Sequence, residues 1–180
     1  MLLITLPAIE MWDDARQEFI SAKEQTLQLE HSLVSLSKWE SKWKKAFLSK
    51  HEKTVEETLD YIKCMTVTRN VSPDVYSRLT NQHIEMINNY IADPMTASVL
   101  PEDKNTKGGR ETVTAELIYY WMISLNIPFE CRTWHLNSLL SLIKVCNFKN
   151  TPPKKMSRKE LTRRNAALNA QRRAKHNTKG

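Results

Sequence analysis

The spacing of apolar residues changes from two to three or four at Ser32, and this change most constrains the fold. Before Ser32, apolar and polar residues alternate in segments 2–6, 9–11 and 26–30, around a polar stretch from Asp13 to Gln17. A period of two is typical of β-strands, and a polar turn between such segments favours a small antiparallel hairpin or meander. Because a unit of this size is marginal alone, we expect it to pack on helices.

Helical spacing begins after Ser32. The first predicted helix steps by three or four residues through Leu33, Leu36, Trp39, Trp43 and Phe47. Within it, Glu40 precedes Lys44 by four residues, a favourable orientation for an ion pair on a helix. A second helix is predicted to begin at Thr54, since Glu57 three residues later completes a capping box. Its inward face is predicted to hold Val55, Leu59, Ile62 and Met65.

Further helix starts are marked by proline and threonine. Ser72–Pro73 predicts a short helical turn, because proline suits the first helical position, and Thr80 predicts the cap of another helix. Residues 93–110 contain prolines and a Gly-Gly pair, which predict an exposed loop. Segment 114–125 is apolar nearly all round, which is typical of a central buried helix. A last core helix is predicted from Thr133.

Charge divides the chain near Thr151. Residues 1–150 hold 17 Lys/Arg and 19 Asp/Glu, whereas residues 151–180 hold ten Lys/Arg and one acid. The break falls at Thr151–Pro152–Pro153, because a residue that precedes proline is pushed out of the helical region. We therefore predict an α+β body of residues 1–150 that is mainly α, followed by a basic C-terminal extension of residues 151–180.

The extension carries helix signals of its own. Ser157 and Glu160 form a second capping box, and the residues that follow are rich in Ala, Leu, Gln and Arg. From Leu161 to Lys175 the only apolar anchors are Leu161, Leu168 and scattered alanines, too few to bury a stable surface. We expect a helical or disordered tail that is frayed until a partner binds.

No catalytic, metal or cofactor-binding pattern is readable. The five histidines share no short spacing with each other or with cysteine, and His135 is predicted to cap a helix or lie half-buried. The three cysteines, Cys64, Cys131 and Cys146, are too widely spaced for a zinc site and are interpreted as buried free thiols of a reducing compartment. No apolar run approaches the ~18 residues of a membrane span, and no signal peptide is recognised. We predict a non-enzymatic, soluble protein.

Two regions are candidates for partner binding. Trp39 and Trp43 lie four residues apart among lysines and are core residues or, alternatively, a protein-binding anchor with a basic rim. The tail has the charge density of an arginine-rich segment, which indicates an anionic partner, either nucleic acid or an acidic protein surface. Its candidate residues are Lys154, Lys155, Arg158, Lys159, Arg163, Arg164, Arg172 and Arg173. The tail lacks the aromatic residues that single-strand binders stack on bases.

Three segments resemble small proteins of long-tailed bacteriophages and of prophages in Gram-positive bacteria. They are Lys23–Trp43, the pair Tyr119–Met122 and Asn126–Glu130, and the tail from Pro152 to Asn169. The role suggested for that group is tail assembly chaperone.

The resemblance implies a non-enzymatic protein of the host bacterial cytoplasm. Such a protein binds the long helical tape measure protein and keeps it in solution while tail tube subunits assemble around it. The C-terminal extension would then recruit the tail tube protein. Two alternatives remain open, a nucleic-acid-binding phage protein that acts through its tail and a structural component of the virion neck or tail. The oligomeric state is not readable from the sequence.

Overall fold

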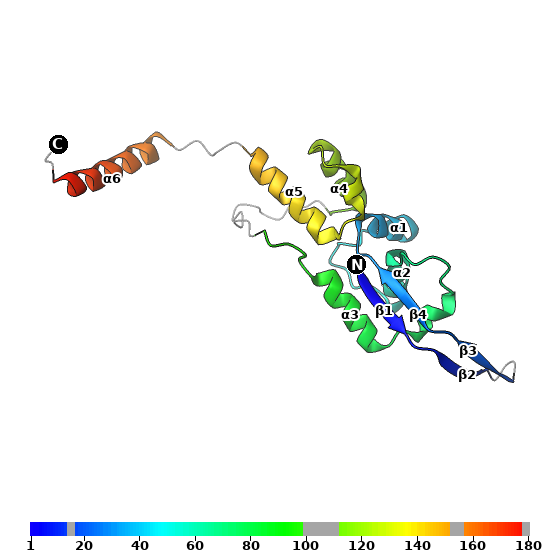
Figure 1. Cartoon of the computed structure of the whole chain (residues 1–180). Helices are drawn as coiled ribbons and strands as arrows, with labels where there is room; N and C mark the ends of the chain where they lie inside the picture. Colours follow the sequence, from blue (N-terminus) through cyan, green and yellow to red (C-terminus); the bar gives the residue numbers. More distant parts are fainter. Residues whose placement is uncertain (14–16, 99–111, 152–156, 178–180) are drawn as a thin grey trace. The chain divides into compact units, whose positions relative to one another are not determined.

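The computed structural model describes residues 1–13, 17–98, 112–151 and 157–177. The chain divides into two compact units, Met1–Asn147 and Phe148–Gly180. The described residues are mainly helical, with a small antiparallel β unit near the N-terminus, which confirms the predicted α+β, mainly α class (Figure 1). The Pro152–Pro153 break on which the predicted boundary rests lies outside the described residues.

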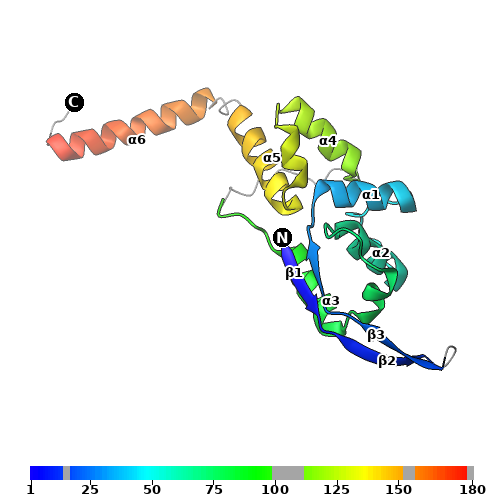
Figure 2. The same cartoon turned by 45° about the vertical axis from the view of Figure 1, so that its right-hand side comes forward.

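The β unit consists of two consecutive strand pairs. Strand β1 (Leu2–Leu6) pairs antiparallel with β4 (Gln25–Leu29), and β2 (Ile9–Asp13) pairs antiparallel with β3 (Glu18–Ala22). One face of β1 and β4 enters the core through Ile4, Leu6, Leu27 and Leu29. The β2–β3 hairpin continues from this pair, and Figures 1 and 2 both show it reaching beyond the helices of the first unit.

The junction between the two strand pairs is held by the short helix η1 (Pro73–Arg78). The guanidinium group of Arg78 donates hydrogen bonds to the backbone oxygen of Lys23, at 3.3 Å, and to that of Pro7. Pro7 directly follows β1, and Lys23 lies between β3 and β4. One side chain therefore fixes the point from which the hairpin extends.

Most of the helices begin where the sequence indicates. The helices are α1 (Leu33–Trp43), α2 (Val55–Met65), α3 (Asn81–Ala92), α4 (Ala115–Ser124), the short η2 (Phe129–Thr133), α5 (Leu136–Asn150) and α6 (Arg158–His176). The predicted capping boxes at Thr54 and Ser157 are both formed, and the Thr80 hydroxyl accepts a hydrogen bond from the backbone of His83. These caps satisfy amide groups that a helix start otherwise leaves without partners.

The core of the first unit joins β1 and β4 to helices α1 through α5. Its largest fully buried side chains are Trp39, Ile4, Leu6, Leu27, Leu29, Leu33, Leu36, Ile62, Met65, Ile87, Ile118 and Met122. A buried carboxylate, Glu40, connects three segments here: its two oxygens accept hydrogen bonds from Phe47 N at 2.8 Å and from Ala115 N at 2.7 Å. The predicted Glu40–Lys44 pairing is therefore wrong, since Glu40 points inward and caps α4.

Helix α1 is shorter than predicted. It ends at Trp43, because Lys44 adopts a left-handed conformation with a φ of 54° and its N–H closes the last turn on the carbonyl of Glu40. Phe47 lies in the following loop and still reaches the core, with 8% of its surface exposed. The apolar spacing thus identified a buried residue but placed it in the wrong element.

Three further expectations need correction. Val55 is 79% exposed instead of inward, because it occupies the first turn of α2. Helix α4 is covered on one side only, since Tyr120 and Ile123 are 63% and 69% exposed. The last helix of the body starts at Leu136 rather than Thr133, after the separate turn η2. Of the predicted loop, residues 93–98 have no regular structure, and 99–111 lie outside the described residues.

Candidate partner-binding surfaces

Trp39 is a core residue. It has no exposed surface, its ring stacks on Trp43 with centroids 6.1 Å apart, and its Nε1–H donates a hydrogen bond of 2.9 Å to the backbone oxygen of Glu57. Trp43 is half-buried, and its Nε1–H donates to Asp60 at 2.9 Å. Both indoles therefore fasten α1 to α2. Because Trp39 has no exposed surface, the structure favours its interpretation as a core residue over its interpretation as a protein-binding anchor.

Two of the lysines beside this pair form ion pairs within the first unit. Lys42 forms an ion pair with Asp60, and Lys45 forms one of 2.5 Å with Glu57. Burial alone would raise the pKa of Asp60, but hydrogen bonds from Lys42 and Trp43 hold it below its usual value. Two lysines of the predicted basic rim thus link α1 and the residues that follow it to α2.

The structure describes some, but not all, of the tail residues that the sequence predicts to bind a partner. Lys154 and Lys155 lie outside the described residues, whereas Arg158, Lys159, Arg163, Arg164, Arg172 and Arg173 all belong to α6. Every described residue of α6 is exposed, and the helix buries no side chain. A nineteen-residue helix without any covered face has little packing energy of its own, so a partner surface is what would stabilise it.

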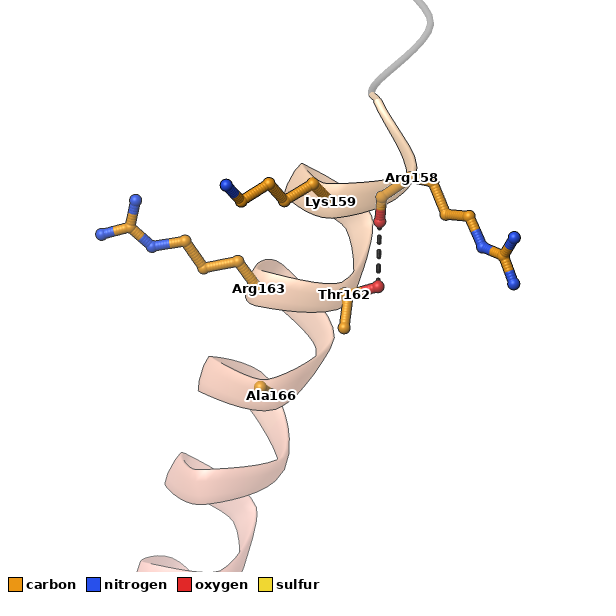
Figure 3. Close-up of a pocket in the computed structure, with 5 residues that line it drawn as sticks. All are labelled: Arg158, Lys159, Thr162, Arg163 and Ala166. Carbon is orange, nitrogen blue, oxygen red and sulfur yellow. Dashed lines mark hydrogen bonds between the residues drawn. The ribbon is translucent and has the colours of Figure 1, made fainter.

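The first turns of α6 carry a shallow, open hollow. It is lined by Arg158, Lys159, Thr162, Arg163 and Ala166. Figure 3 shows Lys159 and Arg163 extending from the same side of the helix and Arg158 from the other, while the Thr162 hydroxyl donates to the backbone oxygen of Arg158 at 2.9 Å. The bases are therefore spread around α6 instead of forming one narrow stripe.

Sequence reasoning missed an exposed aromatic pair on the hairpin. Trp12 of β2 and Phe19 of β3 are directly opposite each other, with ring centroids 5.0 Å apart in an edge-to-face arrangement. They are 50% and 71% exposed. Trp12 and Phe19 lie on either side of the polar stretch in the sequence, but the pairing register had to be known before they could be recognised as a pair.

The first unit also contains a buried cluster of titratable rings. Nδ1 of His31 and the hydroxyl of Tyr61 are 2.6 Å apart, the rings of His31 and His135 are 5.1 Å apart, and Nε2 of His135 lies 3.0 Å from the backbone oxygen of Tyr90. Burial, with a smaller effect of His135, lowers the pKa of His31 to about 4. Because these rings are buried, the cluster stabilises the fold and offers no group to a substrate.

His135 also caps α5, as predicted, since its Nδ1 accepts a hydrogen bond of 3.3 Å from the backbone of Asn137. Among residues 1–13, 17–98, 112–151 and 157–177, no group of three or more His, Cys, Asp or Glu side chains is placed to hold a metal ion. Within the same residues, no helix has the length and apolarity needed to cross a bilayer.

Comparison of the chain with protein-family models, with curated proteins and with solved structures finds no match.

Proposed function

We propose that this chain is a non-enzymatic tail assembly chaperone of a long-tailed bacteriophage, acting in the cytoplasm of the bacterial host. In this proposal it binds the tape measure protein through α6 and keeps that protein in solution while the tail tube assembles. The observation that carries the proposal is α6 itself, a capped helix of nineteen residues in which no side chain is buried.

The apolar residues of α6 favour a helical protein as the partner. Leu161 and Leu168 are 44% and 40% exposed and lie seven residues apart, which places them on one side of the helix two turns from each other. Two leucines seven residues apart have the heptad spacing at which helices contact one another in coiled coils. A long helical chain such as the tape measure protein presents a matching stripe, and the surrounding lysines and arginines would pair with its acidic residues.

Nucleic-acid binding is the second candidate, and the charge of α6 supports it. The helix holds seven Lys/Arg and one Glu. Each phosphate contact would release counterions, so binding would weaken steeply as salt rises. Against this candidate, α6 has no aromatic side chain for base stacking, and its two leucines would face solvent or the phosphate backbone without gain.

A co-expression experiment tests the proposal. The full-length chain is produced together with the phage tape measure protein, in wild-type form and as Leu161→Gln/Leu168→Gln, which removes the apolar stripe while keeping helix propensity. Wild type is expected to co-purify with the tape measure protein and keep it in solution. The leucine variant is expected to lose at least about tenfold in recovered complex, since two apolar contacts are removed.

The matched control is Ala167→Gln/Ala174→Gln, which has the same spacing on a different side of α6. It should behave as wild type. Equal recovery of the tape measure protein with all three chains would remove α6 from the proposal. Detection of the chain in purified virions would favour a structural role instead, because a chaperone leaves the finished particle.

A further inference from the structure

We infer that α6 of one copy docks on the β2–β3 hairpin of a second copy, so that the protein self-associates through two elements its own fold leaves uncovered. This inference does not depend on the proposed function. It uses a side of α6 different from that of Leu161 and Leu168.

The first observation is the exposed pair on the hairpin. Trp12 and Phe19 are adjacent across the strands, and each leaves half or more of its surface in water. Large aromatic side chains contribute most of the apolar area at protein interfaces and act as anchors there. Figures 1 and 2 show the hairpin extending away from the helices of the first unit, so its faces are open to another molecule.

The second observation is the charge of the hairpin. Strands β2 and β3 contain no basic residue, and Glu10 is the acidic residue on the face of Trp12 and Phe19. Glu10 is exposed and stands two residues before Trp12, on the same face of the strand. An aromatic pair beside a carboxylate selects a cationic partner, because ring faces attract Lys and Arg while the carboxylate pairs with them.

The third observation is that α6 offers the complementary surface. Lys159 and Arg163 are four residues apart on one side of the helix, and Ala166 follows on the same side (Figure 3). The alanine leaves room for an aromatic ring to approach the helix, and the guanidinium of Arg163 is suited to stack on the indole of Trp12. Lys159 lies about 200° around the helix from Leu161, so this side is separate from the leucine stripe.

A second copy is the occupant that these observations specify. Both elements belong to every copy, they carry opposite charge, and both are exposed. Each copy thus presents one hairpin that can receive a helix and one α6 helix that can dock on another copy. Reciprocal exchange between two copies closes a dimer, and one-way exchange builds longer oligomers.

Charge exchange in the full-length chain tests the inference. The helix variant is Lys159→Glu/Arg163→Glu, whose acids near the start of α6 suit the helix dipole. The hairpin variant is Glu10→Lys, at the exposed acidic residue on the face of Trp12 and Phe19. Mass is measured by sedimentation at low and at high salt, because salt screens exposed charges.

The expected results are specific. Wild type forms dimers or larger oligomers at low salt, and each variant alone associates at least about tenfold more weakly because like charges then face each other. Mixing the two variants restores association, since the acidic helix of one meets the basic hairpin of the other. A chain with all three substitutions also self-associates. Lys50→Glu/Arg69→Glu is the control for the helix variant, with the same change of net charge at exposed sites of the first unit.

Two outcomes would overturn the inference. One is a wild type that stays monomeric at every concentration, which includes the case of a helix folding back on its own hairpin. The other is self-association that the two variants leave unchanged. The hairpin variant separates this inference from the proposed function, because it should lose self-association while α6 still recovers the tape measure protein.

Discussion

The carboxylate of Glu40 accepts a 2.7 Å hydrogen bond from the backbone N–H of Ala115, so a side chain in the middle of α1 caps the start of α4. The same carboxylate accepts from Phe47 N, and only 7% of the residue is exposed. Two segments far apart in the sequence are thereby tied to one buried charge. The α4 helix contributes its positive end to this site, which lowers the cost of burying the carboxylate.

Glu40→Ala is predicted to lower the free energy of unfolding by about 2–4 kcal/mol, because it leaves two buried N–H groups without acceptors. Urea denaturation measures the loss. Glu85→Ala, on the exposed side of α3, is the control and should change stability by less than about 0.5 kcal/mol. Equal effects of the two substitutions would contradict the capping role of Glu40.

Arg78 is predicted to control the mobility of the β2–β3 hairpin. Arg78→Ala removes the hydrogen bonds to Pro7 and Lys23, so amide hydrogen exchange in β2 and β3 should accelerate by about tenfold. Exchange in α1 and α2 should stay as in wild type. Arg69→Ala, at another exposed arginine, should leave both regions unchanged. Uniform acceleration along the chain would instead indicate a global loss of stability.

His31 is predicted to make the fold sensitive to mild acid. Its pKa is lowered from 6.5 to about 4 by burial and by His135, so between these values the unfolded chain binds a proton that the folded chain does not. Stability is therefore fully present above pH 6.5 and falls as the pH drops, by about 3 kcal/mol at pH 4.

Unfolding midpoints measured from pH 7 to pH 4 test this prediction. His31→Gln keeps an oxygen that can accept from Tyr61 but does not titrate, so its stability should vary less over the range. Identical pH profiles for wild type and the variant would show that the loss of stability in acid comes from other groups.

The two tryptophans of α1 should differ in their contributions to stability. Trp39→Ala is predicted to cost about 3–5 kcal/mol, because it opens a cavity at a residue with no exposed surface. Trp43→Phe keeps most of the half-buried ring and loses one hydrogen bond to Asp60, which should cost about 1 kcal/mol. Thermal unfolding compares them. A mild effect of Trp39→Ala would contradict its assignment to the core.

Local patterns predicted the starts of helices better than their ends. The caps at Thr54, Thr80 and Ser157 were predictable because each depends on only a few adjacent residues. The end of α1 was not, since Lys44 adopts a left-handed conformation without being glycine. The inward position of Glu40 was not predicted either, because one of its two partners, Ala115, is 75 residues away in the sequence.

Exposure was the least predictable property. Tyr120 and Ile123 are apolar enough for a core, yet no described neighbour covers them, and periodicity cannot reveal which face lacks a neighbour. The alternation in segments 2–6 and 26–30 predicted strands but left open which pairs with which. Once β2 pairs with β3, Trp12 and Phe19 are brought together as an exposed pair. The candidate surface on the hairpin thus depends on register, whereas the one on α6 was predictable from charge alone.

The most direct test of the central claim is a competition between two partners for the purified full-length chain. Affinity is measured for a tape measure segment and for a DNA duplex at low and at high salt, with wild type and with Leu161→Gln/Leu168→Gln. The account predicts that wild type binds the tape measure segment more tightly, retains most of that affinity at high salt, and loses it with the leucine variant. Tight, salt-sensitive DNA binding that the leucine substitutions leave intact, without binding to the tape measure segment, would contradict the account.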